Sequence, residues 1–288
     1  MIRIGFNLWF RDLPKLRERL VKAVEIGLEH AELSIDYPFG IVELEPFYTM
    51  AKSVREFGLS ISVHAPWQEI HLASPLSEVR EASLKIIQRV VDEAYRIEAQ
   101  YLVLHVTSEQ SICKAKRRPL ENPCVKAAIN SLSELAKYAE DRGLYIAVEN
   151  AGDVCCGRID LYSYIVSEAP ILACIDIAHA IASDRQLLKR VQEVDYADVL
   201  REWVSAIGLE KLYALHLHGI RVDSSGRVEE HVDLSQNRVD VKRIVQLTSR
   251  YLKFIVFEIF RSASGREFDI VELAQLVKEF KSWAIAYA

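Results

Sequence analysis

Residues 125–150 read VKAAINSLSELAKYAEDRGLYIAVEN, a helical stretch that one glycine separates from an apolar strand. The spacing of apolar residues predicts a helix over the first part, and Gly143 can adopt the left-handed conformation that ends a helix. The run LYIAVEN (144–150) is almost continuously apolar. Such runs are typical of strands buried on both faces of a parallel sheet. This stretch therefore indicates an α/β fold.

The same alternation continues along the chain in both directions. Apolar, β-branched runs that predict strands occupy residues 2–9, 31–36, 59–65, 101–106, 144–150, 171–177, 212–218 and 253–259. Amphipathic stretches with helical spacing lie between them. Eight strands alternating with about eight helices predict a (β/α)8 TIM barrel. We find no linker or change of composition, so we expect a single domain over residues 1–288.

Composition excludes several classes of protein. The chain is 288 residues long and 50% hydrophobic, which is ample for a large core. No run approaches the ~18 consecutive apolar residues of a membrane span. MIRIGFNLWF (1–10) reads directly as a strand, without the regions of a secretory signal. We therefore expect a cytoplasmic protein with no membrane partner.

Charge and cysteine content restrict the partners and the chemistry. The net charge of −5 argues against broad electrostatic binding of nucleic acid, although a local basic patch is not excluded. The five cysteines show no zinc-ribbon spacing. Cys174 lies in a predicted strand and is expected in the core. Cys113 and Cys124 flank one loop, and whether they form a disulfide is left open.

Histidines and acids recur where the predicted strands end. In a TIM barrel, the carboxyl ends of the strands surround the active site. Burying three acids without cations would be costly, so repeated hydrogen-bonded core residues are a poor explanation. A set of nitrogen and oxygen ligands without sulfur suits Zn, Mn, Co or Fe better than Mg. The candidate metal ligands are His64, His105, Glu149, Asp176, His179, His216, Glu229, His231 and Glu258.

Other side chains near the predicted mouth are candidates for substrate binding. Trp9 and Trp67 follow strands and could stack on a sugar or base, or simply pack at the rim. His218 follows His216 by two residues and could contact substrate or support the site. Basic side chains in the loop after residues 101–106, and one past Glu258, could bind a phosphate. These basic residues are Lys114, Lys116, Arg117, Arg118 and Arg261.

The motifs HAPW, LHV, VEN, DIAH, LHLHG, EEH and FEI, in this order, resemble the xylose isomerase-like barrel superfamily, and most closely its endonuclease IV branch. The resemblance implies three zinc ions. It implies that one ion binds His64, His105 and Glu149, and that a second binds Glu149, Asp176, His216 and Glu258. The third would bind His179, Glu229 and His231. The segment Glu229-Glu230-His231 stands where the endonucleases carry Asp-Arg-His.

A second branch, the sugar isomerases and ketose epimerases, resembles this chain in a smaller set of residues. Glu149, Asp176, His216 and Glu258 would hold one Mn, Co or Mg ion. The two glutamates would then act as acid and base on the carbon beside a carbonyl. That chemistry does not need His64, His105, His179 and His231 as ligands. The four additional histidines therefore favour a centre with several metals.

These observations favour a metal-dependent phosphoester hydrolase that carries two or three zinc ions, with Glu149 and Glu258 as the central carboxylates. A sugar or sugar-phosphate isomerase or epimerase is the alternative, and a non-catalytic binding barrel is a third class. We expect a small phosphorylated or sugar-containing substrate. DNA is less favoured, because the segments that handle DNA in the endonucleases differ here after His216 and after His179.

Overall fold

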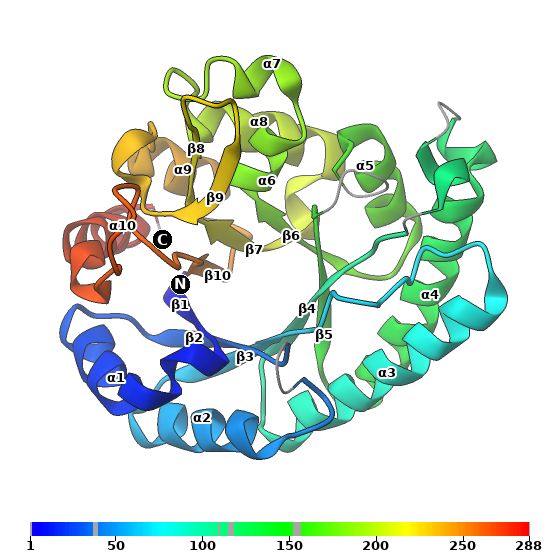
Figure 1. Ribbon diagram of the computed structural model, residues 1–288, viewed down its shortest axis with the longest axis horizontal. Coiled ribbons are helices and arrows are strands. Elements are labelled where there is room, and N and C mark those ends of the chain that lie inside the picture. Colours follow the sequence, from blue (N-terminus) through cyan, green and yellow to red (C-terminus); the bar gives the residue numbers. More distant parts are fainter. Residues whose placement is uncertain (1, 37–39, 109, 115–117, 152–156, 288) are drawn as a thin grey trace.

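Eight parallel strands form a closed barrel with helices on its outside (Figure 1). The computed structural model describes residues 2–36, 40–108, 110–114, 118–151 and 157–287. Around the barrel the strands follow the order β1-β10-β7-β6-β5-β4-β3-β2. Their bounds are β1 Arg3–Leu8, β2 His30–Ser34, β3 Ser60–His64, β4 Tyr101–His105, β5 Tyr145–Glu149, β6 Leu172–Asp176, β7 Leu212–Leu217 and β10 Phe254–Phe257. The predicted TIM barrel is confirmed, and each strand ends within two residues of its predicted bounds.

Amphipathic helices cover the outside of the barrel. In α3 the residues Ile87, Val90, Val91 and Ala94 are buried at helical spacing, so this face packs inward. Among the described helices none has both the length and the apolar character of a membrane span. The helices are α1 Leu16–Glu25, α2 Glu45–Glu56, α3 Ser77–Arg96, α4 Pro123–Glu140, α5 Ile159–Glu168, α6 Ile177–Ala182, α7 Arg185–Leu188, α8 Tyr196–Ile207, α9 Val241–Thr248 and α10 Ala274–Ala286.

The end of the barrel that carries the strand N-termini is filled by side chains. Tyr101, Val103, Cys174 and Phe254 form an apolar cluster inside the barrel, so the core position predicted for Cys174 is confirmed. His30 begins β2, is fully buried and lies between the hydroxyls of Ser60 and Ser62, at 2.9 and 2.8 Å. This part of the interior is therefore packed, and the chemistry is left to the opposite end.

Two features build up the rim where the strands end. An antiparallel hairpin, β8 (Gly219–Val222) and β9 (Val228–Val232), follows β7 directly and lies beside α6 at the mouth (Figure 1). A disulfide between Cys113 and Cys124 joins the loop after β4 to α4, with 5.6 Å between the Cα atoms. The pairing that the sequence left open is therefore present. The hairpin and the disulfide therefore both lie in the segments that follow the carboxyl ends of the strands.

Candidate metal centre

The register of the barrel brings the predicted ligands together. His105 at the end of β4 pairs with Glu149 at the end of β5, and Asp176 on β6 pairs with His216 on β7. In a parallel barrel all the carboxyl ends point to the same opening. Residues that are distant in sequence therefore meet. Glu149 Oε2 lies 3.1 Å from Nε2 of His105, 44 positions away, and 3.2 Å from Nε2 of His64, 85 positions away.

Over the described residues, three groups of side chains could each hold a metal ion. Within each group the potential ligand atoms lie within 4.8 Å of one another. The first group is His64, His105 and Glu149, and the second is Glu149, Asp176, His216 and Glu258. These are the residues expected for the first two ions. The third group is His179, His218 and His231. It contains His218 in place of the expected Glu229.

Unpaired buried atoms indicate that cations fit this centre. Within the described part of the chain, eight buried side-chain nitrogen and oxygen atoms have no hydrogen-bond partner. Six of the eight belong to Glu32, Glu149, Asp176, His216 and His218. Native structures rarely leave such atoms unpaired, because each costs about 1–3 kcal/mol. Carboxylate oxygens and imidazole nitrogens directed at a shared ion would remove this cost.

Hydrogen bonds orient two of the histidines in the way that is usual for metal-binding histidines. His64 Nδ1 donates to the carbonyl of Ala65 at 2.9 Å, and His231 Nδ1 to the carbonyl of Glu258 at 3.2 Å. In the neutral form of each ring, the Nε2 atom is then unprotonated and can bind a metal. A metal-binding histidine almost always donates its other N–H to an oxygen in this way.

Glu32 is a buried carboxylate that the sequence analysis missed. It lies in the middle of β2, is 0% exposed, and its Oε1 lies 3.0 Å from His216 Nε2. The Ser62 hydroxyl donates to Glu32 Oε2 at 2.9 Å. The contact between Glu32 Oε1 and His216 Nε2 leaves His216 Nδ1 facing Glu149 and Glu258, which lie 3.3 and 3.4 Å away. A charged residue inside an apolar run was the signal that could have revealed it.

The charges within the centre shift its acids in opposite directions. Burial acts to raise the pKa of Glu149, but His216 and His105 hold it well below its usual value. Burial raises the pKa of Glu258, and the negative charge of Glu149 adds to this effect although His216 opposes it. Burial acts to lower the pKa of His64, but its contact with Glu149 raises it to about 9. Perturbed groups of this kind concentrate at functional sites.

A cavity of about 730 Å³ opens over the potential metal-binding side chains. The predicted aromatic residues Trp9 and Trp67 both line it. Trp67 is 49% exposed, and its ring stacks over His105 with 6.5 Å between centroids. Trp9 stacks on Phe260 at 5.5 Å. A volume of this size is typical of pockets for small molecules.

Several of the predicted residues lie elsewhere. Glu229 forms an ion pair with Arg221 and does not line the cavity, because that pair holds its carboxylate on the hairpin. Its neighbour Glu230 lines the cavity instead. Arg118 and Arg261 are exposed, and neither is part of the cavity lining. The side chain of Lys114 is not described, and Lys116 and Arg117 lie outside the described residues. His218 belongs to the third group and not to the cavity wall.

Curated relatives are similar to the chain over most of its length. A protein named probable endonuclease 4 from Carboxydothermus hydrogenoformans is 26% identical over 298 residues, which cover 96% of this chain and 97% of the relative. Endonuclease 4 of Thermus thermophilus is 22% identical over 246 residues, which cover 83% of this chain and 84% of the relative.

Solved structures share the fold. A D-tagatose 3-epimerase-like protein superposes with a TM-score of 0.69 at 18% identity, and 99% of each chain is covered. A crystal structure of endonuclease IV from Thermus thermophilus superposes with a TM-score of 0.62 at 20% identity, also with 99% of each chain covered. The family model described as xylose isomerase-like TIM barrel matches residues 20–280. The chain therefore belongs to the xylose isomerase-like TIM barrel family, as its motifs predicted.

Proposed function

We propose that this protein is a metal-dependent phosphoester hydrolase of the endonuclease IV type. The proposal depends mainly on one observation. His64 and His105 form one potential metal site, and His179 and His231 contribute to another, beyond the four-residue group around His216. A centre that holds one ion would not need these histidines. The relatives named probable endonuclease 4 and endonuclease 4, at 26% and 22% identity, support the same activity.

Glu149 has the central role in this proposal. Its Oε2 lies 3.2 Å from His64 Nε2 and 3.3 Å from His216 Nδ1, so one carboxylate serves the first two groups. Bound divalent ions would lower the pKa of a water and stabilise the leaving oxygen of an in-line displacement. The protein supplies ligands that hold the ions, and the aromatic walls of Trp9 and Trp67 hold the substrate.

The expected substrate is a small phosphoester. The cavity of about 730 Å³ suits a sugar phosphate or a single nucleotide. The described basic residues Arg118 and Arg261 do not line it, and the net charge is −5. DNA therefore remains a less favoured substrate, which would have to enter as a nucleotide turned out of the helix.

Epimerase or isomerase chemistry is the second candidate, and a specific observation supports it. Glu149 and Glu258 lie on either side of His216 Nδ1, at 3.3 and 3.4 Å, and their pKa values are shifted in opposite directions. Two carboxylates that differ in this way can serve as base and acid. One ion held by Glu149, Asp176, His216 and Glu258 would then be sufficient.

One experiment separates the two candidates. Metal-free protein is reloaded with zinc or with manganese and is assayed on bis(p-nitrophenyl) phosphate, sugar phosphates and an abasic oligonucleotide. In parallel, ketoses are incubated with it in deuterium oxide and examined for exchange. We expect zinc-dependent release of nitrophenol or phosphate that Glu149→Gln abolishes, with Glu229→Gln as the control that retains it. Deuterium exchange without hydrolysis would instead identify an epimerase.

A further inference from the structure

We propose that the third metal site is built from imidazoles alone, those of His179, His218 and His231, and that it takes a nitrogen-preferring ion such as zinc, cobalt or nickel. Glu230 positions His179 within it. The resemblance to the endonucleases implies a carboxylate, Glu229, at this site, and the structure places that residue elsewhere. The inference rests on the proposed metal centre and adds a site with its own metal preference.

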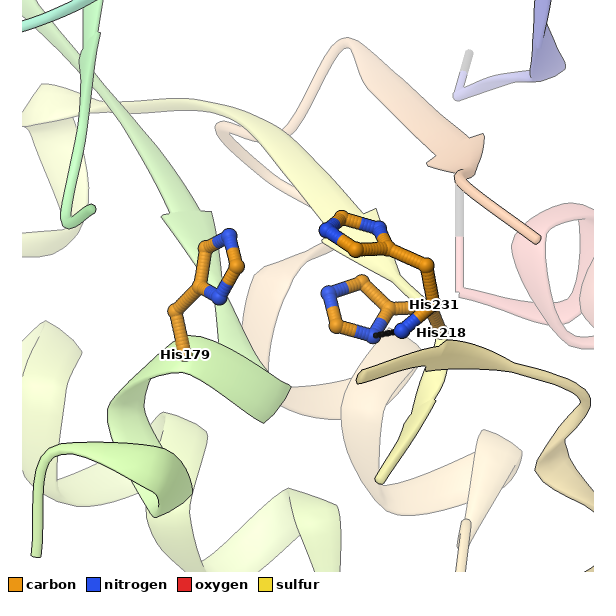
Figure 2. A group of neighbouring side chains, drawn as sticks. All are labelled: His179, His218 and His231. Atoms are coloured by element: carbon orange, nitrogen blue, oxygen red, sulfur yellow. Dashed lines mark hydrogen bonds between the residues drawn. The ribbon is translucent and has the colours of Figure 1, made fainter. Parts of the chain in front are cut away.

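The three rings are directed at one another from three different elements (Figure 2). His179 lies on α6, His218 follows β7, and His231 lies on β9. The His218 and His231 rings stack with 4.0 Å between centroids, and the His179 ring is 5.2 and 5.4 Å from them. One ligand nitrogen from each ring lies within 4.8 Å of the others, a spacing at which the three could hold one ion.

Each of the three rings has an oxygen acceptor for Nδ1. His179 Nδ1 lies 2.7 Å from Glu230 Oε1, His218 Nδ1 lies 3.1 Å from the carbonyl of Gly219, and His231 Nδ1 lies 3.2 Å from the carbonyl of Glu258. When these Nδ1 atoms donate, every Nε2 is an unprotonated ligand atom. This arrangement, one ring nitrogen to an outer oxygen and the other to the ion, is the usual one for metal-binding histidines.

His218 provides an independent observation that points to a ligand. Its side chain is 0% exposed, and its Nε2 and Asp176 Oδ2 lie 3.0 Å apart although neither atom has a hydrogen-bond partner. A metal ion bound between the three rings would satisfy the unpaired His218 Nε2, while Asp176 belongs to the neighbouring group around His216. The backbone N–H of His231 donates to His218 Nδ1 at 3.0 Å. Binding of an ion at Nε2 would require the other tautomer, in which Nδ1 donates to the carbonyl of Gly219 and the contact with the His231 N–H opens.

The backbone explains why Glu229 is replaced at this site. Successive residues of a strand point to opposite faces, so Glu229 and Glu230 cannot both face the cavity. Glu229 pairs with Arg221 across the hairpin. His231 has a φ of 55°, a conformation rare for a residue other than glycine. This turn breaks the alternation and lets His231 line the cavity together with Glu230.

The ligand atoms predict a difference in metal preference between the sites. The group around His216 has three carboxylates and one imidazole, a set that also suits manganese and magnesium. Three imidazoles discriminate against those two ions, because borderline metals bind nitrogen much more strongly. The protein is therefore expected to hold zinc in the third site even when excess manganese fills the carboxylate-rich one.

The test measures metal content in the full chain. Metal-free protein is dialysed against excess manganese with limiting zinc, and both metals are determined per chain by elemental analysis. We expect about one equivalent of zinc to be lost in His218→Ala, while Glu229→Gln keeps the wild-type content. Cobalt spectra provide a second readout, because the intense bands of a four-coordinate, nitrogen-rich site should disappear with His218. Glu230→Gln should weaken zinc binding at this site by about 10- to 100-fold.

Two results would overturn the inference. In the first, Glu229→Gln loses one equivalent of zinc and His218→Ala keeps it, which is the result expected if Glu229 is the ligand. In the other, the wild type binds no zinc in the presence of manganese. Thermal melting and near-ultraviolet circular dichroism check that the variants fold, and His231→Ala replaces His218→Ala if that variant does not. Metal content is independent of turnover, so a chain that binds zinc as expected but hydrolyses no phosphoester would contradict only the proposed function.

Discussion

Replacing Glu32 should weaken metal binding, although this residue belongs to none of the three potential metal-binding groups. Its Oε1 lies 3.0 Å from His216 Nε2, its Oε2 accepts from Ser62 at 2.9 Å, and the side chain is 0% exposed. These contacts keep the His216 ring turned so that Nδ1 faces Glu149 and Glu258. Without them the ring can rotate, and its proton can move to the nitrogen that should bind the ion.

The size of the effect follows from the contacts that each variant keeps. Glu32→Gln preserves the volume and one oxygen acceptor but removes the negative charge, so we expect about a tenfold loss of affinity at the His216 site. Glu32→Ala also removes the acceptor of the Ser62 hydroxyl and leaves the buried His216 Nε2 without a neighbouring carboxylate. We expect about a hundredfold loss, or about 3 kcal/mol of binding free energy.

Competition with a chromophoric chelator at pH 7.5 measures the affinity, and elemental analysis measures the stoichiometry. Ser60→Ala is the matched control, because it removes a hydroxyl 2.9 Å from His30 Nδ1 without touching Glu32. Its affinity should remain within about twofold of wild type. Our reasoning is refuted if folded Glu32→Ala protein binds zinc as tightly as the wild type at every site.

Three further outcomes follow from the site. Saturating zinc at 100 times its Kd should stabilise metal-free protein by about 3 kcal/mol, seen as a Tm increase of roughly 5–10 °C; an unchanged Tm would mean that no ion binds the folded state. Trp67→Ala should raise KM up to about tenfold with little change in kcat, because a ring that is 49% exposed at the cavity would contribute to substrate binding only. Tyr95→Ala, at an exposed position on α3, is the control. A loss confined to kcat would contradict a role of Trp67 in binding. Burial lowers the pKa of His30 to about 3, so from pH 6.5 down to 5 the unfolded chain binds a proton that the folded one does not. As the pH falls over this range, the unfolding free energy of the metal-free wild type should therefore decrease by about 1 kcal/mol per pH unit more than that of folded His30→Asn. Unfolding free energies that change in parallel with pH in the two proteins would disprove this.

The sequence was enough to predict the barrel and most of the residues that form the potential metal-binding groups. Strands buried on both faces appear as nearly continuous apolar runs, and a parallel barrel turns all their carboxyl ends to one opening. A histidine or acid at the end of such a run must therefore lie near the others. This is why His64, His105, Glu149, Asp176 and His216 were found without any knowledge of their contacts.

Contacts between distant residues determined the rest. Glu229 and Glu230 are chemically equivalent in the sequence, and the choice between them depends on Arg221 and on the left-handed turn at His231. Residues within a strand give no sign of their partners either, so Glu32 became part of the site only through His216, which is far away in the chain.

The sequence by itself determined which residue types stand at the strand ends, because hydrophobic periodicity and strand direction are local properties of the chain. The tertiary structure decided which atoms face one another. Only the fold brings His179, His218 and His231 together, and only the 5.6 Å between Cα atoms allows Cys113 and Cys124 to join. The physical reason is that a ligand set depends on distances and ring orientations, which arise when separate elements pack.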